Sequence, residues 1–200
     1  MVDRLIEFFK ARMPLTSEHE QLARSLLSAR RVKKGETLQR AGDVATHGYF
    51  VTEGCLRSFT IDDKGREHVL QFAPEGWWLT DFTSMRDSTP STYFIEALED
   101  SGVVLMTHAA HTRLVETVPG YASAFATGLL KMAAARDKRL LDSLSATAEQ
   151  RYLNFLDTYP SIARRVPQHM LASYLGITPE TLSRLRAQLA RPKRAKPGAR

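Results

Sequence analysis

The spacing of apolar residues changes twice along the chain and divides it into three regions. In the segment from Asp3 to Lys10 apolar residues recur at helical intervals. Between Arg31 and Met106, short runs rich in β-branched and aromatic residues alternate with glycines roughly ten residues apart, a rhythm typical of a small antiparallel barrel or sandwich. Helical spacing then returns and continues to Leu189. The pattern predicts an α+β chain with an antiparallel β-roll between helical ends.

The central region is expected to form an antiparallel roll of about eight strands. Its clearest strand candidates are Tyr49–Glu53, Leu56–Ile61, His68–Phe72, Tyr93–Leu98 and Val103–Met106. The segment Asp62–Gly65 supplies a hairpin turn with glycine where a positive φ is needed. A roll of this kind can hold a pocket in its mouth.

A long helix is expected from about Gly120 to Leu144. Its apolar positions and one arginine repeat at intervals of three and four residues: Phe125, Leu129, Met132, Arg136, Leu140 and Leu144. Such a seam predicts a parallel partner helix, with Arg136 as a polar position that sets the register. The alternative is that this seam packs on the roll of its own chain.

The stretch from Gln168 to Leu189 predicts two short helices around a tight turn. Gly176 can end the first helix in the left-handed region, Thr178 can cap the second, and Pro179 suits its first position. The second helix has an apolar inner face of Leu182, Leu185 and Leu189. This is the helix-turn-helix pattern, whose second helix enters the DNA major groove. An ordinary helical hairpin is the alternative.

Positive charge gathers in the same region. The chain has a net charge of +6, and from Ala146 onward it holds ten basic and three acidic residues, so the preceding part is close to neutral. A basic module of this kind is typical of a polyanion binder. The residues expected at DNA are Thr178, Glu180, Thr181, Ser183, Arg184, Arg186, Gln188, Lys193 and Arg194. We expect Arg184 to contact guanine and Glu180 a cytosine amino group. Phosphates are expected to be contacted by Arg186, Lys193 and Arg194.

Composition and motifs disfavour several other classes of protein. Cys55 is the single cysteine, so internal disulfides and multi-cysteine metal or iron–sulfur sites are excluded. No apolar run is long enough for a membrane span and no signal-peptide profile is present, so we expect a cytoplasmic protein. The pair His108 and His111 is expected in a solvent-facing first helical turn. Without a nucleophile–base arrangement or a phosphate-cradling loop, we expect neither an enzyme nor a metal site.

The stretch from Lys34 to Arg57 resembles the opening of a cyclic-nucleotide-binding β-roll. With the helix-turn-helix behind it, the chain resembles the Crp/Fnr superfamily of bacterial transcription regulators over most of its length and in the same order of parts. The resemblance implies a double-stranded β-helix with flanking helices in residues 1–119, a dimerisation helix in 120–145 and an all-α DNA-binding domain in 146–190. Residues 191–200 form a basic tail expected to be disordered when free, and no residues remain for a clear wing.

The same resemblance implies partners. They are a second copy of the chain and double-stranded DNA with a pseudo-palindromic operator, whose half-site centres lie about 34 Å apart. RNA polymerase is a further candidate partner, and no membrane is expected. The alternative function is a small-molecule sensor that acts through a protein partner instead of DNA. A metal-dependent enzyme of the roll is a weaker third hypothesis.

The resemblance also bears on cyclic AMP. Relatives that bind it hold its phosphate with a Gly-Glu pair and, ten residues after the Glu, an Arg followed by Ser or Thr. Here these places hold Thr80-Asp81 and Ser91-Thr92, so the cation is missing and Asp81 would repel a phosphate. Cyclic AMP is therefore not expected to bind in the usual way, and no cofactor is expected. The candidate pocket is expected to be vacant or adapted to another effector; the alternative is that its residues merely pack the roll. The residues expected to line it are Trp78, Thr80, Asp81, Ser91, Thr92, Tyr93, Arg136 and Asp137.

Overall fold

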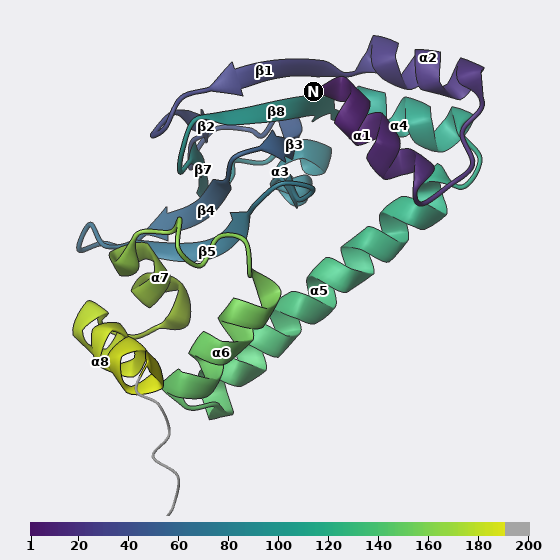
Figure 1. Cartoon of the computed structure of the whole chain (residues 1–200). Helices are drawn as coiled ribbons and strands as arrows, with labels where there is room; N and C mark the ends of the chain where they lie inside the picture. The colour runs from purple at the N-terminus through teal and green to yellow at the C-terminus, as the bar shows by residue number, and fades with distance from the viewer. Residues whose placement is uncertain (191–200) are drawn as a thin grey trace, which may run out of the picture.

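A computed structural model describes residues 1–190 as two antiparallel sheets with helices at both ends (Figure 1). One sheet has the order β1 (Ser28–Val32), β8 (Ser101–Thr107), β3 (His47–Glu53), β6 (Trp78–Leu79). The other has the order β2 (Thr37–Gln39), β7 (Phe94–Ala97), β4 (Leu56–Ile61), β5 (Glu67–Ala73). The α+β roll expected from the alternating pattern is confirmed.

The two sheets enclose one apolar core. Val51, Leu56, Ile95 and Val103 are completely buried within it. β3, β4 and β8 are buried over runs of four or five consecutive residues, because both of their faces are covered there. The turn between β3 and β4 needs Gly54, because its φ is +86° and a Cβ there would lie 2.3 Å from the Ser101 hydroxyl oxygen. This close approach ties the β3–β4 corner to the start of β8.

Helices of the N-terminal half cover one end of the roll. They are α1 (Val2–Lys10), α2 (Ser17–Leu26), the short α3 (Phe82–Asp87) and α4 (His108–Thr117). The hydroxyl of Thr16 caps α2 by accepting from the His19 backbone N–H. Phe9 packs edge-on against Tyr121 with ring centroids 5.6 Å apart. These helices therefore anchor the start of the long helix that follows.

The C-terminal half is helical. Helix α5 (Tyr121–Ser145) runs diagonally from α4 past the roll to α6 (Ala148–Thr158), and α7 (Gln168–Leu175) and α8 (Pro179–Ala190) follow (Figure 1). Thr147 and Gln150 form a capping box at the start of α6. Among the described helices, none combines the length and apolar character needed to cross a bilayer.

Candidate nucleic-acid interface and effector cavity

The turn between α7 and α8 has the geometry predicted for it. Gly176 adopts φ +65°, and its backbone N–H donates to the Ser173 carbonyl at 3.1 Å. The Thr178 hydroxyl accepts from the Thr181 N–H at 3.3 Å, and Pro179 is the first residue of α8. Leu182 of α8 is completely buried against α7 and α6. The turn therefore fixes α8 by its apolar side.

The opposite side of α8 faces solvent. Its exposed polar residues are Glu180, Ser183, Arg184 and Gln188. Within the described residues the Arg184 side chain makes one long hydrogen bond, from Nε to the Glu180 carbonyl at 3.4 Å. Bonds from the Glu180 backbone N–H and the Thr178 hydroxyl hold the pKa of the Glu180 carboxyl below its ordinary value. An arginine guanidinium and a carboxylate, bonded only to the first turn of their own helix, thus lie together on one exposed face.

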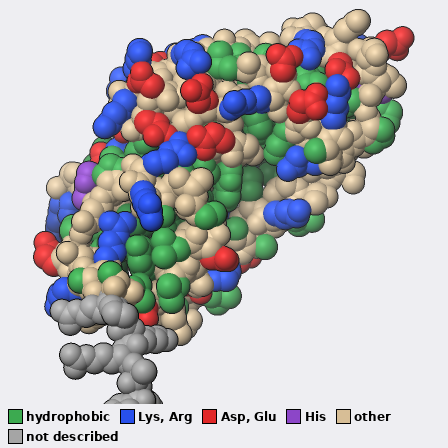
Figure 2. All heavy atoms as spheres, in the orientation of Figure 1, with side chains coloured by type: hydrophobic (Ala, Val, Ile, Leu, Met, Phe, Trp, Pro, Cys, Tyr) green, Lys and Arg blue, Asp and Glu red, His purple; other side chains and the backbone are tan. Residues whose placement is uncertain are grey.

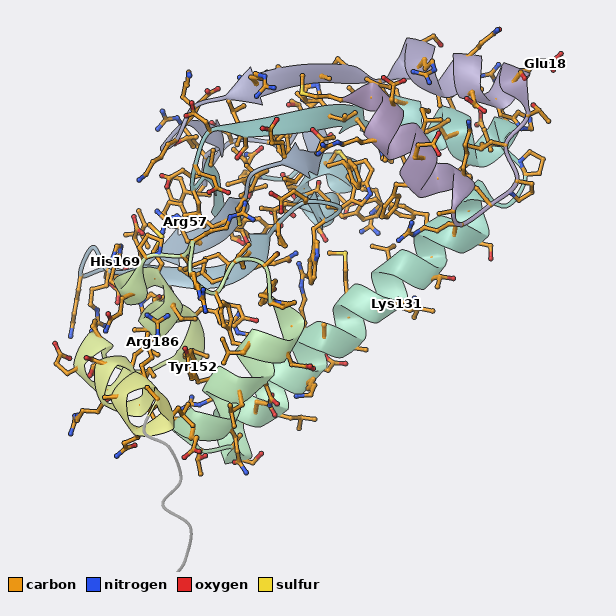
Figure 3. The ribbon with its side chains drawn as sticks, in the orientation of Figure 1. Glu18, Arg57, Lys131, Tyr152, His169 and Arg186 are labelled. Carbon is orange, nitrogen blue, oxygen red and sulfur yellow. The ribbon has the colours of Figure 1, made fainter. Side chains whose placement is uncertain are left out.

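Not every residue expected at DNA lies on that face. Arg186 turns inward, where Nε donates to the Tyr152 hydroxyl at 3.1 Å and Nη2 to the Ala163 carbonyl at 3.4 Å (Figure 3). A phosphate-contacting role for Arg186 is therefore not supported by its position. Thr181 is half-buried, and Leu189, expected to face inward, is exposed. Lys193 and Arg194 lie outside the described residues.

The expected seam of α5 divides between two faces. Phe125 packs with the N-terminal helices, while Met132 and Arg136 border the cavities beside the roll. Large apolar side chains are exposed along the other side, which we call the outer stripe: Leu130, Leu140, Leu141 and Leu144, with Asp137 between them. The seam as a dimer contact stays a prediction. Its five steps over 19 residues average about 3.8 residues, more than the 3.6 of one helical turn, so its first and last residues lie on different sides of α5.

A cavity of about 1060 Å³ lies between the roll and α5. Figure 2 shows hydrophobic side chains gathered between these elements. Of the expected effector residues, it is lined by Trp78, Thr80, Asp81, Thr92, Tyr93 and Arg136. The other two lie elsewhere: Ser91 is buried beneath the cavity wall, and Asp137 is exposed on the outer stripe.

The Asp81 carboxylate is already engaged within the roll. One of its oxygens caps α3 by accepting from the Ser84 N–H at 3.0 Å, and the other accepts from the Ser91 hydroxyl at 2.9 Å. The Tyr93 hydroxyl donates to the Thr80 carbonyl at 2.8 Å, and burial raises its pKa. The segment compared with a phosphate cassette on the sequence is thus a self-contained hydrogen-bond network that includes an acidic residue.

His111 and Cys55 are both buried, and burial shifts the pKa of each side chain. His111, expected toward solvent, is buried with Nδ1 3.2 Å from the Tyr121 hydroxyl, and burial lowers its pKa. The periodicity of α4 turns this residue inward onto Tyr121 and Phe125. Cys55 is also buried, and burial raises the pKa of its thiol to about 12. A protonated, enclosed thiol is a poor nucleophile or metal ligand.

The helix-turn-helix is docked on the roll by contacts that the sequence analysis did not identify. The Ser173 hydroxyl caps the edge of β5, accepting from the Val69 N–H at 3.0 Å and donating to the Glu67 carbonyl at 2.9 Å. Arg139 of α5 donates to the Val69 carbonyl at 2.9 Å and the Tyr174 carbonyl at 2.8 Å. Phe72, Phe155 and Leu171 join in one buried cluster. Side-chain caps on an otherwise free sheet edge satisfy its backbone groups.

A second polar contact strengthens this docking. Arg165, in the segment before α7, forms a two-point ion pair with Glu75 at 2.9 and 3.2 Å and also pairs with Glu99. Both carboxylates belong to the roll. Arg165 and Arg139 are therefore structural cations, and only a part of the C-terminal positive charge remains free on the surface.

Comparison with known proteins supports the architecture. A family model described as the cyclic nucleotide-binding domain matches residues 29–118, from β1 to the end of α4. The chain is 28% identical over 181 residues to the fumarate and nitrate reduction regulatory protein of Vibrio cholerae, covering 84% of this chain and 71% of that protein. The Escherichia coli K12 protein of the same name is 28% identical over 191 residues, covering 86% and 74%.

Solved structures show the same fold. FixK2 of Bradyrhizobium japonicum has a TM-score of 0.70 at 20% identity, covering 82% of this chain and 84% of that one. The c-di-GMP responsive global regulator CLP of Xanthomonas campestris has a TM-score of 0.69 at 18% identity, covering 89% and 97%. The order of roll, long helix and C-terminal helices is thus shared along most of the chain.

Proposed function

We propose that the chain is a transcription regulator of the Crp/Fnr type, acting as a homodimer whose two α8 helices bind double-stranded DNA; its similarity to fumarate and nitrate reduction regulatory proteins and its fold support this. The observation that carries this proposal is the division of α8 into two faces. Leu182 is buried, whereas Glu180 and Arg184 are exposed and free to hydrogen-bond base edges. A helix held firmly on one side and polar on the other can enter a major groove without rearranging its own core.

Dimerisation is supported by the outer stripe of α5. Leu130, Leu141 and Leu144 have exposed fractions of 71%, 63% and 77%. With Ala134 and Asp137, these three leucines follow a spacing of four, three, four and three residues, which is the heptad pattern of a two-helix seam; Leu140 of the outer stripe lies beside this seam. Burying this stripe against a second copy would remove an apolar row from water. Asp137 lies at the centre, so we assign to it the polar register position first expected at Arg136.

This arrangement suggests a function for each part of the chain. We assign residues 1–119 to an effector domain, 120–145 to dimerisation and 146–190 to DNA binding, in a cytoplasmic regulator that acts on transcription by RNA polymerase. The effector domain does not use cyclic AMP in the usual way. A phosphate would need a cation at this place, but the place holds the Asp81 carboxylate, which accepts a hydrogen bond from the Ser91 hydroxyl. The cavity of about 1060 Å³ beside it is large enough for a different effector.

The proposal is tested by equilibrium binding of the purified chain to labelled duplex DNA at several salt concentrations. Counterion release predicts a linear fall of log K with log salt, with a slope of roughly −0.9 per phosphate contacted. A flat slope, or no binding at low salt, would reject DNA as the partner and favour a sensor that acts through another protein. Ion release depends on phosphate contact, so the slope separates the two functions directly.

A further inference from the structure

A second, smaller cavity lies where the DNA-binding helices meet the roll. It measures about 230 Å³ and is bordered by β5, α5, α6 and α7 together. It adjoins the larger cavity at Trp77, Met132 and Arg136, but α6 and α7 border only the smaller one. This cavity therefore exists only while the C-terminal helices are docked on β5.

Positive charge converges on this cavity. Arg136, Lys138, Arg139 and Arg151 line it together with a single carboxylate, Asp142. That carboxylate is occupied by Lys138 at 3.0 Å and by the Asn154 amide at 2.8 Å. Within residues 1–190, none of the three arginines forms an ion pair. The wall therefore carries excess positive charge. Arg136 and Lys138 are exposed, but Arg139 and Arg151 are half-buried, where charge is costly unless it is neutralised.

The arginines are also incompletely hydrogen-bonded. Nε of Arg151 is buried and has no hydrogen-bond partner among the described residues. Arg136 is exposed and makes one long bond, from Nη2 to the Gln71 amide oxygen at 3.4 Å, so its guanidinium is available to a ligand, whereas the Arg151 donor is buried. Native structures seldom leave buried donors unpaired, and such a group calls for an explanation such as an absent ion or ligand. Arg139 differs, because its guanidinium is already bonded to backbone carbonyls.

We propose that this cavity binds a small phosphate-bearing metabolite, with the phosphate held by Arg136 and Arg151. Two guanidinium groups present planar forks that suit phosphate oxygens better than an ammonium does. Much of the remaining wall is aromatic, including Trp77, Tyr159 and Tyr174, and would accept an apolar or ring-shaped body. The volume restricts the ligand to a small molecule. This site shares Trp77, Met132 and Arg136 with the roll cavity, but Arg151 and the α6 and α7 wall belong to it alone, and it goes beyond the proposed function.

Binding here has a defined consequence for the molecule. The wall combines residues of the roll with residues of α6 and α7, so the ligand binds the docked arrangement and not one in which the helices have moved away. A ligand that binds one of two arrangements stabilises it in proportion to its concentration over its dissociation constant. The anion therefore strengthens the contacts that Ser173 and Arg139 make with β5.

Trp77 lines the cavity, so its fluorescence reports binding. In a Trp78→Phe background, which leaves Trp77 as the one tryptophan, inorganic phosphate is titrated into the full chain at constant ionic strength with chloride as balance. We expect a saturable change with phosphate and none with chloride. Arg151→Gln and Arg136→Gln should each weaken phosphate binding about tenfold or more, the effect of losing a charge-assisted bond.

Controls separate loss of the site from loss of folding. Arg164→Gln removes one positive charge from the exposed segment before α7, outside the cavity, and should bind phosphate as the parent does. Arg151→Lys keeps the charge and should retain part of the affinity. Each variant is first checked for an unchanged circular dichroism spectrum and unfolding midpoint without phosphate. Equal affinities for Arg151→Gln and Arg164→Gln, or an equal response to chloride, would overturn the proposal.

The readout contains no DNA, so it is independent of the proposed function. A chain that binds phosphate as expected but ignores duplex DNA would retain this site and lose the regulatory function. A chain that binds duplex DNA but not phosphate would overturn the proposal of this site and leave the regulatory function standing.

Discussion

Helices α5 and α8 each have an inner face and an outer face, and the two faces differ in whether their side chains have partners. On the inner faces, Arg139 is bonded to carbonyls of β5 and α7, and Arg186 is bonded to Tyr152. On the outer faces, Leu141 is exposed and Arg184 has one long bond within its own helix. The inner faces hold the molecule together, and the outer faces are available to other molecules.

The residue types on the outer faces indicate different partners. On α5 the outer stripe is apolar with one acidic residue, which suits another helix of the same kind. On α8 the outer face is polar and includes a free arginine fork, which suits base edges and phosphates. We therefore expect one protein partner and one nucleic-acid partner, on two separate surfaces.

The largest expected effect concerns the outer stripe of α5. Leu141→Arg would place two equivalent positive charges, one from each copy, opposite each other in the dimer seam and should weaken dimerisation at least about hundredfold, because like charges are costly to bury together. Sedimentation equilibrium measures the change. Lys131→Ala, on the flank of the same helix (Figure 3), is the control and should leave dimerisation intact. If Leu141→Arg remained as dimeric as the parent, the outer stripe would not be the seam.

Arg184 and Arg186 lie two residues apart on α8 but on its outer and inner faces. Arg184→Ala should cost about 1–3 kcal/mol of binding to specific DNA and relax the sequence preference, with little change in the free energy of unfolding. Arg186→Ala should instead reduce the free energy of unfolding, because its bonds to Tyr152 and Ala163 are internal. DNA titration gives the binding free energy of each variant, and urea titration gives its free energy of unfolding. Reversed roles would show that the outer and inner faces have been misassigned.

The inner face of α5 can be tested by Arg139→Met. This change removes donors to the carbonyls of Val69, Leu70 and Tyr174 and should lower the free energy of unfolding by about 1–2 kcal/mol. Urea unfolding gives the value. Arg113→Met, which removes only an exposed contact with Glu116 at 3.9 Å, should change it by less than about 0.5 kcal/mol. Equal effects of the two variants would mean that Arg139 contributes no docking contact.

The smallest expected effect is a pH dependence from the buried His111. Burial lowers its pKa below 6.5, so the unfolded chain binds a proton that the folded chain does not as pH falls past 6.5. Stability should therefore decrease between pH 7 and the lowered pKa, and His111→Gln should flatten that decrease. His47 adds to the slope in the same sense, since burial lowers its pKa as well. His169→Gln, at an exposed site, should preserve the slope; an unchanged slope in His111→Gln would contradict the assignment.

Local signals explain why the helix-turn-helix could be predicted from sequence. Gly176, Thr178 and Pro179 act within a few residues of their own positions, so their roles do not depend on the rest of the fold. The cap formed by Asp81 carried a similar signal, an acidic residue three positions before Ser84, but the comparison with a phosphate cassette obscured it.

Long-range packing explains what the sequence could not provide. Whether Met132 or Leu141 faces the roll depends on how α5 is docked, and helical periodicity alone does not fix that choice. The contacts of Arg139 and Arg165 join residues 35 to 90 positions apart. The excess of basic residues in the C-terminal region was visible, but its division between structural and free cations required the fold.

The most direct test of the central claim is to select bound fragments from random duplex DNA and determine the enriched sequence. Two copies of α8 on a symmetric dimer predict an inverted repeat whose half-site centres lie about 34 Å, one helical turn, apart. In the Arg184→Ala variant the same selection should lose its preference at one position in each half-site. An enriched sequence without two-fold symmetry, or no enrichment at all, would contradict the account.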